Sequence, residues 1–421
     1  MISWVFLAVT LIGAWFTFNA YVPHRRTGPL IVPSFFAGWL TAELSAHHFA
    51  WQVVATVVFV ALGALDAWPG WVGLAITVVS WLGLLALVPV SRRAAPVLES
   101  ALGDALGASY RGSLAAEIEA AMRKPHPRGR LMVPFWLTHP DVKVTRNVAY
   151  VDDGDDRHLL DVYAPRDGVR NAPVLLQIHG GGWIIGNKHE QGLPLMTHLA
   201  ARGWVCVATN YRLSPRATFP DHIIDVKRAL RWVRENISEY GGAPDFVVAT
   251  GGSAGGHLSS LLALTPGEPE YQPGFEDADT RVEACVPFYG VYDWSNTYDT
   301  WAQPGLDRVL ERTIMKKKMS EDPEAFRRAS PMHRIHPDAP PFFVIHGTHD
   351  SLAPVEEARH FVKLLRRTSR SPVAYAEIPG AQHAFEIFHS TRTRYTVEAV
   401  ERFVAWVYSR HLADRAQKAT G

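Results

Sequence analysis

Apolar positions are distributed very differently in the first ninety residues and in the rest of the chain. Residues 2–22 and 71–90 are apolar almost without interruption, and a third apolar run covers about 49–65. About 20 consecutive apolar residues, folded as a helix, cross the hydrocarbon core of a membrane. Polar faces at helical spacing, which a helical bundle buried in a water-soluble protein would show, are missing from these runs. The pattern predicts a transmembrane region of three or four spans within residues 1–93.

The count of spans depends on the stretch 30–46. It is apolar, but it carries Pro33 near its start and Glu43 near its end. A proline tends to interrupt a helix, and a carboxylate is costly inside a membrane. The stretch is therefore either a fourth, short span or a re-entrant segment, and the sequence leaves both open.

Basic residues suggest how the region is oriented. Arg25 and Arg26 follow the first apolar run, and Arg92 and Arg93 follow the last. A signal peptide carries its positive charge before the apolar stretch, so we expect the first run to remain as a span. With three spans, both Arg pairs fall on the cytoplasmic side, as the positive-inside rule requires. We therefore favour a multi-pass membrane protein whose C-terminal domain faces the cytoplasm.

Beyond residue 93 the pattern changes twice. Residues 94–145 are polar and rich in small side chains, which indicates a linker with one or two amphipathic helices. After about residue 146, strand-like apolar runs alternate with helical patterns such as 221–236 and 393–412. This alternation predicts a mostly parallel, doubly wound α/β sheet across 146–421. The strand-like runs are 148–152, 158–165, 173–179, 204–212, 246–250, 284–290, 341–347 and 373–379.

Charge and cysteine content narrow the function classes. The chain has 42 Lys+Arg and 41 Asp+Glu residues, a formal net charge of +1, so nothing indicates a nucleic-acid partner. The short basic run 316–318 is interpreted as a solvated helix face. The only two cysteines, Cys206 and Cys285, lie in apolar runs and are expected to be buried, although one bridge remains possible. Two cysteines exclude a disulfide framework and offer too few soft ligands for a metal site.

The first candidate for chemistry is the segment 251–255, with the sequence GGSAG, which directly follows the strand-like run 246–250. G-x-S-x-G between a strand and a helix is a nucleophile elbow, which exposes its serine at the carboxyl edge of a sheet. Ser253 is therefore the candidate nucleophile. Taken alone the motif is weak, because glycine-rich turns are common.

A second segment, 179–183 with the sequence HGGGW, follows the strand-like run 173–179. Three glycines allow bare backbone N–H groups to point at a substrate oxygen, as in the oxyanion loops of esterases and lipases. We expect Gly181, Gly182 and Ala254 to donate the hydrogen bonds of an oxyanion hole.

Two further candidates follow late strands. Asp350 comes after the run 341–347, and His383 comes after the run 373–379, so that the order along the chain is Ser, Asp, His. His383 would accept the proton of Ser253, and Asp350 would orient the imidazole. Glu356 competes for the acidic role but lies inside a predicted helix. Three nearby histidines are interpreted as structural hydrogen-bonding groups: His257, His346 and His349.

These motifs together carry a resemblance to a known family. Residues 146–412 resemble the hormone-sensitive-lipase-like esterases of the α/β-hydrolase fold through HGGGW, GGSAGG, HGTHD and the late His383. With its apolar N-terminus, the chain is similar to mycobacterial Lip-type carboxylesterases. The resemblance implies hydrolysis of short- to medium-chain acyl or lipid esters through an acyl-enzyme, with no metal or organic cofactor. One position departs from the family, because Gly252 stands where an acidic residue usually precedes the nucleophile.

The segment 292–335 is long for a loop, and insertions of this kind form caps over a site. We expect a helical cap here, whose side chains either line an acyl pocket or pack within the cap; the candidates are Trp294, Tyr298, Trp301 and Met315. Two other functions use the same features: an amidase or peptidase with the same machinery, and a non-catalytic membrane scaffold that has kept the fold. The sequence carries no signal of oligomeric state.

Overall fold

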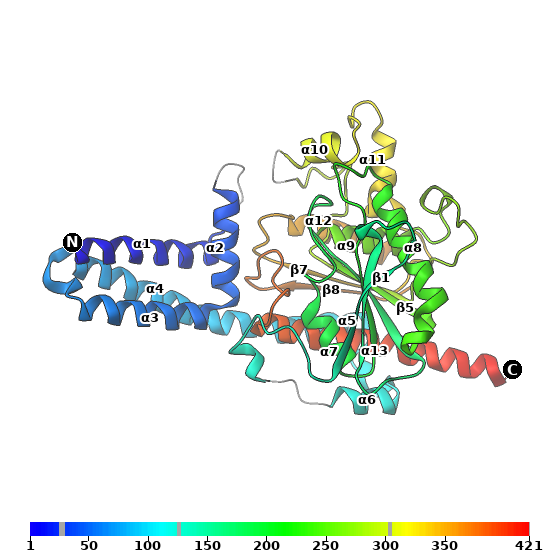
Figure 1. Ribbon diagram of the computed structural model, residues 1–421, viewed down its shortest axis with the longest axis horizontal. Helices are drawn as coiled ribbons and strands as arrows, with labels where there is room; N and C mark the ends of the chain where they lie inside the picture. Colours follow the sequence, from blue (N-terminus) through cyan, green and yellow to red (C-terminus); the bar gives the residue numbers. More distant parts are fainter. Residues whose placement is uncertain (25–29, 124–127, 302–304, 421) are drawn as a thin grey trace.

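The computed structural model describes residues 1–24, 30–123, 128–301 and 305–420, and it shows a helical arm projecting from an α/β domain (Figure 1). The arm consists of three helices that lie side by side. A fourth helix, α2, runs across the base of the arm between α1 and the α/β domain (Figure 1). The four helices are α1 (Ile2–Tyr21), α2 (Ile31–Glu43), α3 (Ser45–Ala61) and α4 (Trp68–Arg92).

Two helical stretches are long and apolar enough to cross a membrane: Ile2–Tyr21, and Trp68–Leu106, where α4 continues into α5 (Ala94–Leu106). The pair α2 and α3 passes the same test only as one unit bent by 97° at Leu44, which allows a third span. Most of the apolar side chains in these stretches face outward, so the arm differs from a bundle buried in a water-soluble protein. The ambiguous stretch 30–46 is a short helix and the bend that follows it.

A buried ion pair fastens α2 to the α/β domain. Arg392 donates a hydrogen bond to Glu43 at 3.0 Å, and neither side chain is exposed. The hydroxyl of Ser390 donates a second bond to the Glu43 carboxylate at 2.7 Å. Arg392 also donates to the carbonyl oxygen of Pro379 at 2.9 Å. Glu43, which made this stretch ambiguous in the sequence, is therefore one of the residues that hold α2 against the α/β domain.

We expect Glu43→Ala to lower the free energy of unfolding by about 3–5 kcal/mol, because it leaves the Arg392 guanidinium buried without its counter-ion. The measurement is the thermal unfolding midpoint of the purified protein in detergent. The double variant Glu43→Leu/Arg392→Met, which removes both charges, should be destabilised by less than the two single changes added together. Strict additivity of the two changes would show that the pair is not coupled.

The linker after the arm contains the helices that its composition predicts. Helix α5 packs Leu98 and Leu102 into the core of the α/β domain, and α6 (Ala116–Met122) follows on the surface. The first strand begins at Val142, four residues before the boundary expected at 146. Half of the side chains of this strand face solvent at the sheet edge, and several of them are polar, such as Lys143. The strand therefore has no continuous apolar run by which its start could be recognised.

The α/β domain is built on one eight-stranded sheet in the order β1-β2-β4-β3-β5-β6-β7-β8. Strands β3 to β8 pair in parallel, whereas β1 and β2 form an antiparallel edge. The mostly parallel, doubly wound sheet predicted from the sequence is therefore confirmed. The strands are β1 (Val142–Ala149), β2 (Leu159–Pro165), β3 (Ala172–Ile178), β4 (Val205–Thr209), β5 (Gly242–Gly252), β6 (Ala284–Phe288), β7 (Phe342–Gly347) and β8 (Val373–Ile378).

Helices cover both faces of this sheet and create two cores. One face packs against α8 (Asp221–Asn236), α9 (Ala254–Leu264) and α12 (Val355–Thr368). The other packs against α5, α7 (Leu193–Ala200) and α13 (Thr391–Thr420). Cys206 and Cys285 are buried, unbridged strand residues, as expected. The expected cap, 292–335, contains the short helices α10 (Leu306–Val309) and α11 (Pro323–Ala329), which Figure 1 shows together beyond one end of the sheet.

Candidate active site

Ser253 occupies a sharp turn between β5 and α9, in the strand–turn–helix context that its motif predicts. Its backbone angles, φ 59° and ψ −121°, lie in a region that non-glycine residues rarely adopt. The Ser253 N–H donates to the carbonyl oxygen of Phe288 at 3.0 Å, and its own carbonyl accepts from the N–H of His257 at 3.0 Å. Neighbouring backbone thus holds the serine at the N-terminus of α9, where free amides and the helix dipole favour negative charge.

Gly252 departs from the family pattern, and the structure gives a physical reason. A Cβ at this position would lie only 2.6 Å from the phenolic oxygen of Tyr289, so a side chain here would have to displace that ring. Tyr289 donates to the buried Glu386 carboxylate at 2.5 Å, and its ring packs 4.5 Å from the ring of His383. Burial raises the pKa of Glu386 to about 7. A tyrosine–glutamate pair therefore fills the space that an acidic residue at 252 would need.

His383 and Asp350 meet at the carboxyl end of the sheet. The Nδ1 atom of His383 lies 2.7 Å from Oδ2 of Asp350, in hydrogen-bonding geometry. The other oxygen of Asp350 accepts from the N–H groups of Leu352 and Ala353 at 2.9 and 2.8 Å. Burial opposes ionisation of Asp350, but His383 and His346 together hold the pKa of its carboxyl below the usual value. Asp350 is thus an ionised, rigidly held acceptor for the imidazole.

The competing residues have other contacts. Glu356 lies on α12 and faces Arg359, and both side chains are exposed. His346 is buried beneath Asp350, with its Nε2 atom 3.2 Å from the carboxylate and 2.9 Å from the carbonyl oxygen of Ala353. His257 is buried on α9 and contacts the carbonyl oxygen of Ala329 through its Nε2 atom at 2.8 Å. The two histidines are thus held in structural contacts, and Glu356 faces solvent.

The glycine-rich loop after β3 is held from several directions. The N–H of Gly180 donates to the side chain of Gln191 at 2.7 Å, and Arg157 donates to the ring of His179 at 3.1 Å. Gly181 has φ +111°, and a Cβ there would lie 2.2 Å from the carbonyl oxygen of Ile185, so only glycine fits. Within the described residues, the N–H groups of Gly181 and Gly182 make no hydrogen bond. They are free to bind a substrate oxygen.

Ser253 and His383 line one cavity of about 700 Å³, together with Gly181 and Gly182. This is a typical volume for a small-molecule site. No hydrogen bond joins Ser253 to His383 in the described parts of the chain, a separation that is common before substrate binds. No group of three or more His, Cys, Asp or Glu side chains in these parts is placed to hold a metal ion.

The remaining cavity wall is largely apolar and comes from several segments, among them the cap and α2. From the cap, Trp301 lines the cavity, whereas Trp294 packs against Trp183 in the core, Tyr298 stacks on His360, and Met315 is buried elsewhere. Helix α2 also lines the cavity, which the sequence did not predict. Its lining residues are Phe35, Phe36 and Trp39.

Comparison with known proteins shows which family the chain resembles. Residues 160–365 match the protein family described as BD-FAE. The chain is 45% identical to the probable carboxylic ester hydrolase LipM of Mycobacterium tuberculosis, over 96% of this chain and 93% of that protein. It is 38% identical to the esterase LipQ of the same organism, over 90% and 86% of the two chains. Among solved structures, esterase 2 of Thermogutta terrifontis phosphoramylated by tabun is 26% identical, with a TM-score of 0.51, over 63% of this chain and 94% of that one.

The sheet topology, the elbow and these likenesses define an α/β-hydrolase of the serine esterase class. Similarity to LipM and LipQ extends into the apolar N-terminal region, since each alignment covers nine-tenths or more of this chain. The chain belongs to the family of mycobacterial Lip-type esterases and is a carboxylic ester hydrolase.

Proposed function

We propose that this enzyme cleaves carboxylic esters with Ser253 as nucleophile, His383 as general base and Asp350 as the group that orients the imidazole. The Ser253 oxygen bonds to the ester carbonyl carbon while its proton passes to Nε2 of His383. The carbonyl oxygen, now negative, is bound by the N–H groups of Gly181, Gly182 and Ala254. The C–O bond to the alcohol then breaks, and the alcohol leaves with the proton from His383.

A water molecule completes the cycle. His383 removes a proton from the water, whose oxygen bonds to the acyl carbon. The bond to Ser253 breaks, the serine regains its proton, and a carboxylic acid leaves. The observation that carries this proposal is the 2.7 Å contact between Nδ1 of His383 and Oδ2 of Asp350. The imidazole of His383 lines the same cavity as Ser253 and the free amides of Gly181 and Gly182.

An organophosphorus probe tests the nucleophile directly. The full-length enzyme in detergent, treated with a fluorophosphonate, should gain one covalent adduct, and mass spectrometry of its peptides should place the adduct on Ser253. Prior incubation with a short-chain ester should slow the labelling. No adduct on Ser253 would favour the scaffold alternative, and faster turnover of an amide than of the matching ester would favour an amidase.

We also propose that the arm crosses the membrane three times, with the catalytic domain on the cytoplasmic side. The arrangement in Figure 1 supports this, because the N-terminus lies at the far end of the arm, whereas α4 reaches the α/β domain near Arg92. Arg92 and Arg93 would then lie on the cytoplasmic side. Arg25 and Arg26 lie outside the described residues. A reporter that is active on only one side of the membrane, fused after Arg93, measures the orientation, and an outside signal would contradict it.

A further inference from the structure

Helix α2 belongs to the active site as well as to the N-terminal region. Its Phe35 ring lies edge-on to the imidazole of His383, with ring centres 6.5 Å apart. The indole N–H of Trp39 donates to the carbonyl oxygen of Ala384, the residue after the imidazole, at 3.0 Å. Phe36 lines the same cavity and is 49% exposed, so it stands at the cavity mouth rather than at its base.

The same helix rests on the end of α1. Gly38 packs so closely on α1 that a Cβ there would lie 2.7 Å from the carbonyl oxygen of Asn19, and Ser34 donates to the side chain of Asn19. The 20 residues of α1 span about 30 Å as a helix, which is the thickness of the hydrocarbon core. If α1 crosses the membrane, α2 lies at the membrane surface, and about one helix diameter, roughly 10 Å, separates that surface from the cavity.

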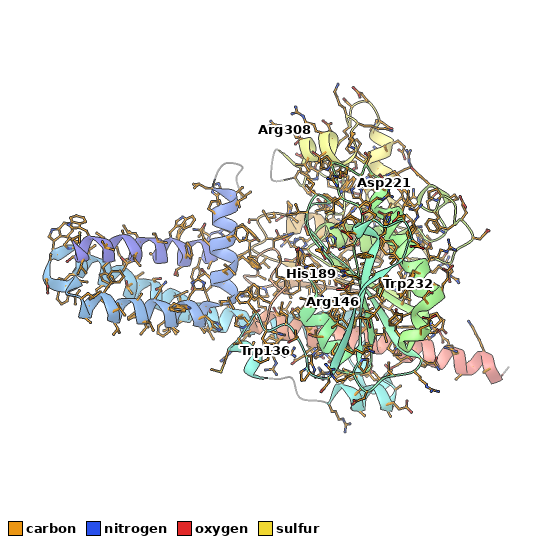
Figure 2. The ribbon with its side chains drawn as sticks, viewed as in Figure 1. Trp136, Arg146, His189, Asp221, Trp232 and Arg308 are labelled. Atoms are coloured by element: carbon orange, nitrogen blue, oxygen red, sulfur yellow. The ribbon has the colours of Figure 1, made fainter. Side chains whose placement is uncertain are left out.

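The mouth of the cavity carries exposed apolar side chains from three separate segments. Besides Phe36, these are Ile185 of the oxyanion loop, 68% exposed, and Leu352 of the loop after Asp350, 40% exposed. A second exposed apolar segment, 132–136, lies beside the base of the arm, where Figure 2 labels Trp136. Exposed apolar side chains gathered at a cavity mouth mark a surface for apolar ligands or lipid.

We infer that the substrate is a long-chain acyl ester dissolved in the membrane, which enters the cavity sideways past Phe36 without passing through water. This rests on the proposed function, because it names the substrate class of the same Ser253 site. Phe35 and Trp39 form the wall along which the acyl chain lies, with its ester group between Ser253 and the free amides of the oxyanion loop. The apolar mouth favours this source of ester over one that diffuses in from the aqueous phase.

Two substrates given to the full-length enzyme in phosphatidylcholine vesicles test the inference. One is a water-soluble p-nitrophenyl butyrate, and the other is a long-chain diacylglycerol embedded in the same vesicles. We expect Phe36→Gln to lower the ratio of embedded to soluble ester hydrolysis by about tenfold, because a polar side chain then stands in the path of the acyl chain. Val32→Gln is the matched control, since Val32 is exposed on the same helix but does not line the cavity.

The outcomes separate the two proposals. Entry from the membrane is supported if the ratio of embedded to soluble ester hydrolysis falls about tenfold in Phe36→Gln and stays within about twofold of wild type in Val32→Gln. An unchanged ratio in Phe36→Gln, an equal fall in both variants, or a wild-type enzyme that hydrolyses only the soluble ester would overturn it while leaving the proposed function intact. Failure of the wild-type enzyme on both esters would instead contradict the proposed function.

Discussion

Ser253→Ala is expected to lower kcat for p-nitrophenyl butyrate by about 10⁶-fold, which is the scale of loss when the nucleophile of a serine hydrolase is removed. The reason is that no acyl-enzyme can form without the hydroxyl. A residual rate of about 10³–10⁴ over the uncatalysed reaction should persist, because the free amides of the oxyanion loop still bind the carbonyl oxygen. Initial rates of the full-length enzyme in detergent measure both quantities.

Ser260→Ala is the matched control for this change. Ser260 is buried on the same helix, α9, does not line the cavity, and its hydroxyl donates to the carbonyl oxygen of Gly256 at 2.7 Å. Its removal should therefore leave kcat nearly unchanged. A Ser253→Ala enzyme that keeps more than a hundredth of the wild-type kcat would show that another group attacks the ester.

Local patterns predicted most elements of the α/β domain. The helix expected over 221–236 matches α8 residue for residue, because its apolar positions follow helical spacing. Most strand runs were recognisable because strands β3, β4, β6 and β7 are buried along their whole length and are almost continuously apolar. The positions of Ser253, Asp350 and His383 followed from the strands that precede them, since parallel strands place their carboxyl ends at one edge.

The contribution of α2 could not be predicted in this way. Its contact with the site joins Trp39 to Ala384, residues separated by 345 positions, and hydrophobic periodicity reports only on neighbours along the chain. The apolar character of Phe35 was equally consistent with lipid contact. The single available signal was Glu43, a carboxylate in an apolar stretch, which needs a buried partner such as Arg392.

The packing around Gly252 had no signal in the sequence either. That position carries no side chain, so the sequence showed only a missing carboxylate. The space is filled by Tyr289, which follows the next strand, β6, and donates a hydrogen bond to Glu386. In the cap, Trp294 and Trp301 look alike in the sequence, since both are tryptophans in the same segment. Only the fold shows that Trp294 is buried in the core and that Trp301 lines the cavity.

Asp350→Asn is expected to lower kcat by about 10⁴-fold through the tautomer of His383. The amide oxygen of the new asparagine can still accept from the N–H groups of Leu352 and Ala353, which now bind Oδ1. Its NH₂ group then faces Nδ1 of His383, which must accept instead of donate. The proton of the neutral ring moves to Nε2, and that nitrogen can no longer take a proton from Ser253.

Glu356→Gln is the matched control, because it removes a carboxylate on the adjacent helix whose contact is an exposed ion pair with Arg359. Such pairs contribute little, so both kcat and stability should stay close to wild type. Circular dichroism of both variants should match the wild-type enzyme, which separates a tautomer effect from unfolding. If Glu356→Gln lost activity while Asp350→Asn retained it, the acidic role would belong to the helix rather than to the loop after β7.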